Sequence, residues 1–245
     1  MRGFILGLLA SAAVVGLTSM PAHGGSFSIS PIRLDLSAAA RSAALTVRND
    51  EREALVQAQV MLWEQVDGED RLTPTRDLIV SPAVFTLPAK GSQLVRVALR
   101  SPPPGDAHER SFRLILQEVP QSANPDFSGL QIALRLSVPV FVANADATGP
   151  AIAWSAAASG DELVLTARNS GDAHARIHGF SVAPTVGGDA PLVQPVGTYI
   201  LPGQTRSWNL GNQGGRTSNS TWRRLRLKVT TDDGESEIEL DTSGE

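Results

Sequence analysis

The chain has 245 residues, enough for one large domain or two domains of about 100 residues each. Hydrophobic residues make up 42% and charged residues 19%, and the formal net charge of −4 argues against a disordered segment or a nucleic-acid-binding protein. Cysteine is absent, which excludes disulfide scaffolds, cysteine-based zinc sites, iron–sulfur sites and thiol nucleophiles.

Residues 1–24 have the pattern of a secretory signal peptide. Arg2 precedes an apolar run from Phe4 to about Leu17, and small residues follow it. No stop-transfer charges come next, and no later run approaches the roughly 20 apolar residues that span a bilayer. We therefore expect cleavage of this segment and export of a mature chain that does not insert into a membrane, to the periplasm if the source is a Gram-negative bacterium.

The next 115 residues or so consist of short alternating runs separated by turn signals, with little helical periodicity. The runs lie at 27–36, 42–49, 54–65, 77–88, 92–100, 111–120 and 130–142. About seven strands in this length are typical of an immunoglobulin-like β-sandwich. We therefore predict an immunoglobulin-like N-terminal domain at 25–146.

A polar connection containing glycine and proline, at 146–150, separates these runs from a second set. In the second set, the apolar residues of 225–229 oppose those of 238–240 across a turn at 232–234, which is a β-hairpin pattern. The sequence therefore predicts an all-β chain whose second β-sandwich domain covers 151–245.

The residues that could carry chemistry do not form a recognisable site. On a strand, His174 and His178 would share one face about 13 Å apart, which is too far for one metal ion. His108 has no evident partner, and no G-x-S-x-G motif occurs. The acidic residues of GDEL and DDGES lie on predicted turns, where we expect them to be solvated. We expect no metal, no cofactor and no enzymatic activity.

The run at 130–142 is unusual because one of its faces is entirely apolar. This face carries Leu130, Ile132, Leu134, Leu136 and Val138. Pro139 cannot donate a ladder hydrogen bond, so the strand is expected at the edge of a sheet. A long apolar edge strand promotes aggregation unless a partner covers it, and we therefore expect a protein partner.

Five segments together resemble the periplasmic chaperones of chaperone–usher pili, in that family's order and spacing. They are SPIRLDLS (30–37), LTVRND (45–50), SPAVFTLPAKGSQLVRV (81–97), RSFRLILQEVP (110–120) and LQIALRLSVPVFV (130–142). The short loop before Leu130 and the proline inside the last run resemble the spore-coat-type, or archaic, branch. The resemblance implies two immunoglobulin-like β-sandwich domains in an L-shaped arrangement, acting without nucleotide or metal.

The resemblance also implies a function, which is to bind and cap pilin subunits by donating an edge strand and to deliver them to an outer-membrane usher. The donated side chains would be Leu130, Ile132, Leu134 and Leu136. In the family, two basic residues bind the C-terminal carboxylate of the subunit, and Arg33 matches the first. The second, a lysine, falls at Pro139. Another basic residue, such as Arg135, Arg113 or Arg96, could replace this lysine, and we choose Arg135. Alternatively, the carboxylate anchor differs in this branch.

A secreted adhesin or carbohydrate-binding sandwich is the alternative. Such a protein would display an exposed aromatic platform. Tyr199 is the only tyrosine, and the four tryptophans are spread over both predicted domains. A secreted β-sandwich enzyme would need clustered titratable groups, which the sequence does not show.

Overall fold

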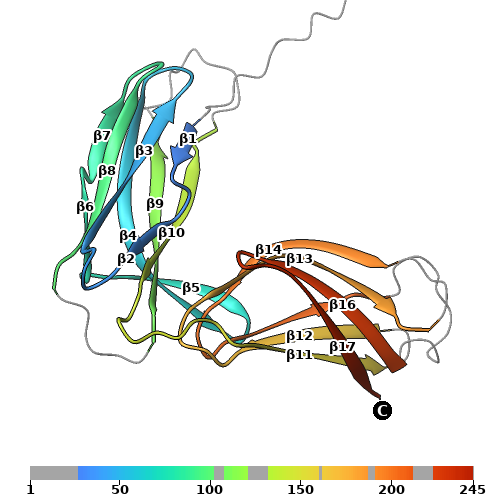
Figure 1. Cartoon of the computed structure of the whole chain (residues 1–245). Helices are drawn as coiled ribbons and strands as arrows, with labels where there is room; N and C mark the ends of the chain where they lie inside the picture. The colour runs from blue at the N-terminus through green and yellow to red at the C-terminus, as the bar shows by residue number, and fades with distance from the viewer. Residues whose placement is uncertain are drawn as a thin grey trace, which may run out of the picture.

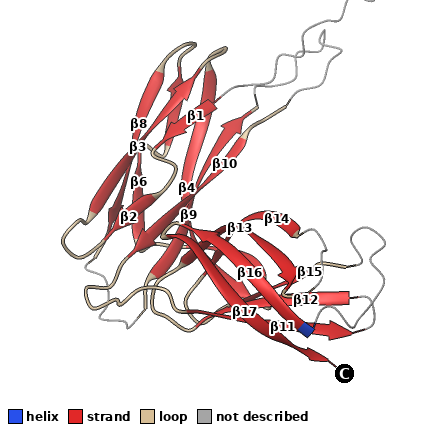
Figure 2. Cartoon of the chain, turned by 45° about the vertical axis from the view of Figure 1, so that its right-hand side comes forward, coloured by secondary structure: helices blue, strands red, loops and turns tan. Residues whose placement is uncertain are grey.

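The structure is a computed structural model that describes residues 27–101, 108–120, 132–159, 162–186, 191–211 and 223–244. The predicted signal peptide and Leu130 lie outside these residues. Strands make up nearly all of the regular structure (Figure 2), so the all-β prediction is confirmed. In the described ranges, no helix is long and apolar enough to cross a membrane.

The first half of the described chain forms two sheets packed face to face. Its strands are β1 (Phe27–Ser30), β2 (Leu34–Leu36), β3 (Ser42–Asn49), β4 (Ala54–Val66), β5 (Glu69–Pro74), β6 (Leu78–Ser81), β7 (Val84–Leu87), β8 (Ser92–Leu99), β9 (Arg110–Val119) and β10 (Arg135–Val142). One sheet has the order β1-β3-β8-β6, and the other has the order β2-β10-β9-β4-β5 with β7 paired to the start of β4. Alternate residues of β4, such as Val56 and Val60, are buried in the core between the sheets.

Two details of this sandwich differ from the sequence prediction. The run 27–36 is divided, because β1 pairs with β3 in one sheet while β2 pairs in parallel with β10 in the other. Pro31 lies at the crossover, where a residue without an N–H cannot continue a ladder. In addition, β4 continues into a hairpin with the unpredicted β5, through a turn in which Asp67 and Gly68 have positive φ angles of 52° and 79°.

The second half of the described chain forms one seven-stranded sheet that folds over itself. Its strands are β11 (Ile152–Ser159), β12 (Glu162–Asn169), β13 (Ala175–Pro184), β14 (Leu192–Ile200), β15 (Thr205–Asn209), β16 (Arg224–Thr231) and β17 (Gly234–Gly244). Their order is β14-β13-β16-β17-β11-β12-β15, and β17 pairs with β16 and then with β11. The predicted hairpin is confirmed, with Asp232 and Asp233 as the turn between Thr231 and Gly234.

The two sandwiches meet at a wide angle and give the chain its L shape (Figure 1). The chain passes from one to the other between the end of β10 and the start of β11. The hairpin turn of β16 and β17 lies in the corner, close to the first sandwich (Figure 1). Long-range contacts can therefore form in this corner between residues that are distant in the sequence.

Each sandwich contains a fully buried asparagine at the end of a strand, Asn49 in the first and Asn169 in the second. The side-chain amide of Asn49 donates to the carbonyl of Pro88 (3.2 Å), and that of Asn169 donates to the carbonyl of Ile200 (3.0 Å). In both cases the side-chain oxygen accepts from the backbone N–H two residues later. The two domains thus use the same arrangement of asparagine hydrogen bonds to hold a turn against the end of a strand.

We expect Asn169→Ala to lower the free energy of unfolding of the second domain by about 2–4 kcal/mol. The substitution removes the donor to the buried carbonyl of Ile200 and the partly buried carbonyl of Ala173, and an unpaired buried group costs about 1–3 kcal/mol. Urea denaturation followed by tryptophan fluorescence measures the change. Asn209→Ala, at an exposed strand end, is the control and should change stability by less than about 0.5 kcal/mol. Equal effects of the two substitutions would contradict a structural role for Asn169.

Candidate functional site

Strand β10 has an open edge over its first half. Its whole length pairs with β9, but only Val140 to Val142 pair with β2 on the other side. The pairing with β9 extends one residue before β10, because the N–H of Glu118 donates to the carbonyl of Leu134 (2.8 Å) and the N–H of Leu134 donates to the Glu118 carboxylate (3.2 Å). In the part of the chain that the structure describes, no strand covers the outer side of β10 before Val140.

The apolar row of this strand changes from exposed to buried along its length. Ile132 is 51% exposed, Leu134 and Leu136 are half-buried, and Val138 is fully buried. The predicted strand 130–142 is therefore too long, since β10 begins only at Arg135. Leu136 packs against the core of its own domain, and Val138 is part of that core, because the two sheets close over the second half of β10. Of the predicted donor side chains in the described residues, Ile132 and Leu134 are the two that lie ahead of this closed part.

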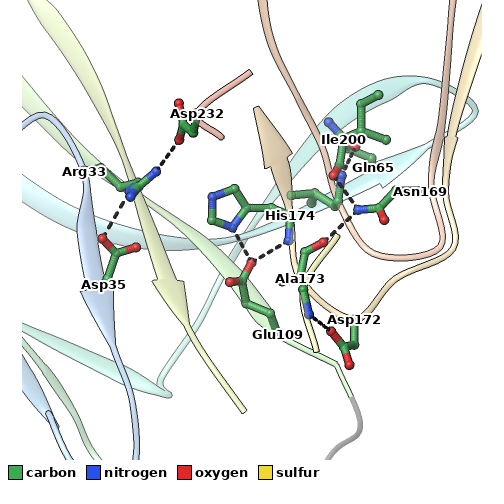
Figure 3. A network of polar contacts seen from close by, with 12 residues as sticks. Arg33, Asp35, Gln65, Glu109, Asn169, Asp172, Ala173, His174, Ile200 and Asp232 are labelled. Atoms are coloured by element: carbon green, nitrogen blue, oxygen red, sulfur yellow. Dashed lines mark hydrogen bonds and ion pairs between the residues drawn. The ribbon is translucent and has the colours of Figure 1, made fainter. Parts of the chain in front are cut away.

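Arg33 lies at the start of β2, where the open edge ends. It comes one residue before Leu34, which pairs with Val140, and so lies beside Pro139. Its Nε donates to the Asp35 carboxylate (3.1 Å), and its Nη1 donates to the Asp232 carboxylate (2.7 Å), as Figure 3 shows. Burial opposes the charged form of Arg33, but the negative charges of Asp35 and Asp232 and the hydrogen bonds to them outweigh it and raise the pKa of Arg33.

Asp232 joins the two domains at this point. Besides Arg33 of the first domain, it contacts His178 of β13, with 2.8 Å between Nε2 of the histidine and the carboxylate. Burial favours the neutral acid, but the hydrogen bonds from His178 and Arg33 are stronger in sum and lower the pKa of Asp232. The side chain of Asp232 is 37% exposed, as expected for an acid in this turn, but it is also bound to Arg33 and His178. No local pattern in the sequence indicated the contact, because the turn and Arg33 are 199 residues apart.

A second arginine flanks Pro139 from the opposite side. Arg113 of β9 pairs directly with Pro139, so that Arg33, Pro139 and Arg113 form a row across three neighbouring strands on one face of the sheet. The guanidinium of Arg113 lies 3.6 Å from the ring centre of Trp63, and burial lowers its pKa. The nearest carboxylate oxygen, on Asp70, is 3.9 Å away.

The other two arginines considered as substitutes lie elsewhere. Arg135 is exposed at the start of β10, four residues and about 13 Å along the strand from Pro139. Arg96 lies on β8, in the opposite sheet of the sandwich. The structure therefore brings Arg113, rather than Arg135 or Arg96, to the position that the sequence left without a base.

Aromatic side chains of both domains pack together beneath this row. Trp63 and Phe141 of the first domain contact Tyr199 of the second, with ring-centre distances of 5.6 Å for each of these contacts. Gln65 reinforces the junction, because its amide donates to the carbonyl of Tyr199 (2.9 Å) and its oxygen accepts from the N–H of Leu201 (3.0 Å). These contacts fix the corner in which Arg33 and Arg113 lie.

The histidines predicted to lie on one face have different partners in the structure. Nδ1 of His174 is 2.7 Å from the Glu109 carboxylate (Figure 3). The ring of His174 stacks on Phe141. His178 contacts Asp232 instead. Among the described residues, no cluster of three or more histidine, aspartate or glutamate side chains has the arrangement of a metal site.

Comparison with known proteins identifies the class. Residues 26–145 match the pili and flagellar-assembly chaperone family, over its PapD N-terminal domain. This domain includes the open edge of β10 together with Arg33 and Arg113. The N-terminal domain therefore belongs to that family of assembly chaperones. No curated protein sequence matches the chain.

Solved structures of chaperones share the two-domain fold. The CsuC–CsuE chaperone–tip adhesion subunit complex from archaic Csu pili of Acinetobacter baumannii matches with 21% identity and a TM-score of 0.63, over 89% of this chain and 99% of that one. The SafB chaperone complex with the SafA pilin from Salmonella enterica matches with 20% identity and a TM-score of 0.61, over 90% and 98%. The E. coli chaperone DraB matches with 21% identity and a TM-score of 0.57, over 90% and 97%.

Proposed function

We propose that this chaperone captures pilin subunits in the periplasm by donating the edge of β10, and that it passes them to an outer-membrane usher. The observation that carries the proposal is the half-open strand, which is paired with β9 throughout but with β2 only from Val140 onward. The similar fold of chaperones solved with a pilin or a tip adhesion subunit supports it. Export follows from the signal-peptide pattern of residues 1–24.

Capture uses the backbone and two side chains of the edge. The free N–H and C=O groups of β10 supply hydrogen bonds to a strand of the subunit, as in other cases of strand addition. Ile132 and Leu134 enter the apolar groove of the subunit, and each contributes about 1.5–3 kcal/mol when fully buried. Leu130 precedes Ile132 with the same two-residue spacing, and we still expect its side chain to be donated to the subunit. Leu136 contributes to the core of the chaperone instead.

Arg33 sets the direction of the captured strand. A strand added to the open edge lies on the same side of β10 as β2, and its end meets Arg33, the residue just before β2. A guanidinium there suits a carboxylate, because its planar fork can bind both oxygens. The C-terminal end of the subunit therefore lies at Arg33, and the captured strand runs parallel to β10.

Arg113 supplies the second positive charge. Neighbouring strands lie about 4.8 Å apart, so that Arg33 and Arg113 are each about one strand spacing from Pro139. The side chain of Arg113 is only 16% exposed, and the described residues give it no carboxylate at hydrogen-bonding distance. A subunit carboxylate would relieve this shortage of partners.

We expect Arg33→Ala and Arg113→Ala each to weaken pilin capture by at least about tenfold, the loss of one charge-assisted hydrogen-bonded contact of about 1.5–3 kcal/mol. Arg33→Lys should restore capture only in part, because lysine keeps the charge but not the fork. The measurement is a binding titration with a pilin subunit whose C-terminus is either free or amidated. Amidation should have the same effect as removing Arg33.

Arg135→Ala and Arg96→Ala are the matched controls, because each removes one positive charge at a distance from Pro139. Neither should change capture by more than about twofold. Weakening by Arg135→Ala as strong as that by Arg113→Ala would assign the second charge to Arg135. If amidation and Arg33→Ala both leave capture unchanged, the carboxylate anchor is wrong.

The alternative, an adhesin or carbohydrate-binding sandwich, is not favoured. The aromatic side chains of the described residues lie in the core of the first domain, at the domain junction and against the core of the second domain, where Trp154 and Trp208 stack on each other. Stacked rings that pack against a core do not form the flat exposed platform that a sugar needs.

A further inference from the structure

In the chaperone without a subunit, Arg33 already binds two carboxylates. Its Nε donates to Asp35, two residues further along the same strand, and its Nη1 donates to Asp232 of the other domain at 2.7 Å. Asp35 and Asp232 differ in the part of the chain that carries them. Asp35 follows Arg33 in β2, whereas Asp232 reaches it from the turn of a hairpin in the second domain.

Asp232 occupies the place that the proposed function gives to the subunit. A terminal carboxylate that binds the guanidinium through both oxygens needs two neighbouring N–H groups. The guanidinium can offer Nε with Nη2 or Nη1 with Nη2, and the contacts to Asp35 and Asp232 engage one donor of each pair. The subunit and Asp232 therefore compete for the pair that contains Nη1. Two negative groups at one guanidinium also repel each other.

Asp232 has a second partner to which it can remain bound. His178, on β13 of the same domain, contacts the other carboxylate oxygen of Asp232 at 2.8 Å. The positive charge of Arg176, also on β13, acts on Asp232 as well. Loss of Arg33 therefore leaves Asp232 with an interaction inside its own domain, and the contacts of Gln65 with Tyr199 and Leu201 stay intact.

We propose that Asp232 is an internal substitute for the subunit carboxylate: it holds Arg33 in the free chaperone and is displaced when a subunit is captured. The proposal rests on the proposed function, in which Arg33 binds the C-terminal carboxylate of the subunit. Competition from Asp232 makes the affinity for subunits lower than it would be if Arg33 were free to bind the subunit carboxylate. Since the side chains of Arg33 and Asp232 are 35% and 37% exposed, water weakens their contact, and the reduction is about two- to fivefold.

Asp232→Asn tests the proposal because it removes the negative charge and keeps the shape of the side chain. Asp233→Asn is the matched control, since it makes the same charge change in the same turn at a residue for which the described structure shows no ion pair. The probe is an eight-residue peptide of alternating valine and threonine with a free C-terminal carboxylate, together with its amidated form. Binding is measured by titration, and thermal unfolding checks that each variant is folded.

We expect Asp232→Asn to bind the free-acid peptide about two- to fivefold more tightly than the unmodified chaperone and to bind the amidated peptide equally well. Asp233→Asn should change neither affinity. Unchanged or weaker binding of the free-acid peptide by Asp232→Asn overturns the proposal. If Arg33→Ala and amidation weaken binding while Asp232→Asn has no effect, only the competition is wrong. If Arg33→Ala and amidation have no effect either, the anchor and the competition are both wrong.

Discussion

Replacing Ile132 and Leu134 together by aspartate is expected to abolish co-purification of the chaperone with a pilin subunit. Both residues precede the part of β10 that its own domain buries, and Ile132 is 51% exposed. In the free chaperone the new carboxylates therefore remain in contact with water. In the complex they would be buried without a partner, at a cost of several kcal/mol for each charge.

The control for this double variant is Ile79→Asp with Leu94→Asp. These two residues are 44% and 50% exposed, and they lie on β6 and β8 in the sheet that does not contain β10. The control has the same charge change on another exposed apolar surface, and it should leave pilin recovery unchanged. Normal recovery with the Ile132/Leu134 variant would show that strand donation does not occur through this edge. Circular dichroism confirms that each variant is folded.

Trp63→Ala is expected to produce the largest loss of stability, about 3–5 kcal/mol. The ring is 2% exposed and contacts Phe141 of its own domain, Tyr199 of the other domain and the guanidinium of Arg113. Its loss leaves a cavity at the junction of the two sandwiches, so we also expect their unfolding to separate. The measurement is urea denaturation followed by circular dichroism, which reports the unfolding of both sandwiches, and one transition should become two.

Trp63→Phe distinguishes the ring from its N–H group. The described residues offer the indole N–H of Trp63 no hydrogen-bond partner, so phenylalanine loses volume but no hydrogen bond. It should cost less than half as much as alanine and keep a single transition. If phenylalanine costs as much as alanine, the indole has a partner that this account omits. If alanine leaves one unchanged transition, the aromatic cluster does not couple the domains.

Much of the fold follows from local patterns in the sequence. Alternation along β4 and the turn at Asp232 and Asp233 predicted a strand and a hairpin, because a buried face and a tight turn depend on neighbouring residues. The extent of the strand ending at Val142 was harder to predict. Its apolar row continues without a break, and only the packing of the opposite sheet decides which of its residues are buried.

The site could be predicted only in part for a similar reason. Arg33 was identified from the segment in which it lies, whereas Arg113 was one of several possible replacements until the register of β9 and β10 placed it opposite Pro139. The contacts of Asp232 were missed. A turn rich in acids is usually solvated, and the contact with Arg33 depends on how two domains are oriented, which no local pattern reports.

The short strand β2 has a consequence for the kinds of subunit that the chaperone accepts. It covers β10 from Val140 to Val142, so that an added strand has room only from about Ile132 to Pro139, roughly 27 Å of extended chain. A polypeptide that continued past this point would collide with β2. Under the proposed capture, the chaperone selects its substrates by where their chain ends and hardly by which residues they contain. One copy would then serve several subunits of unrelated sequence, whereas a short C-terminal extension would exclude an otherwise suitable one.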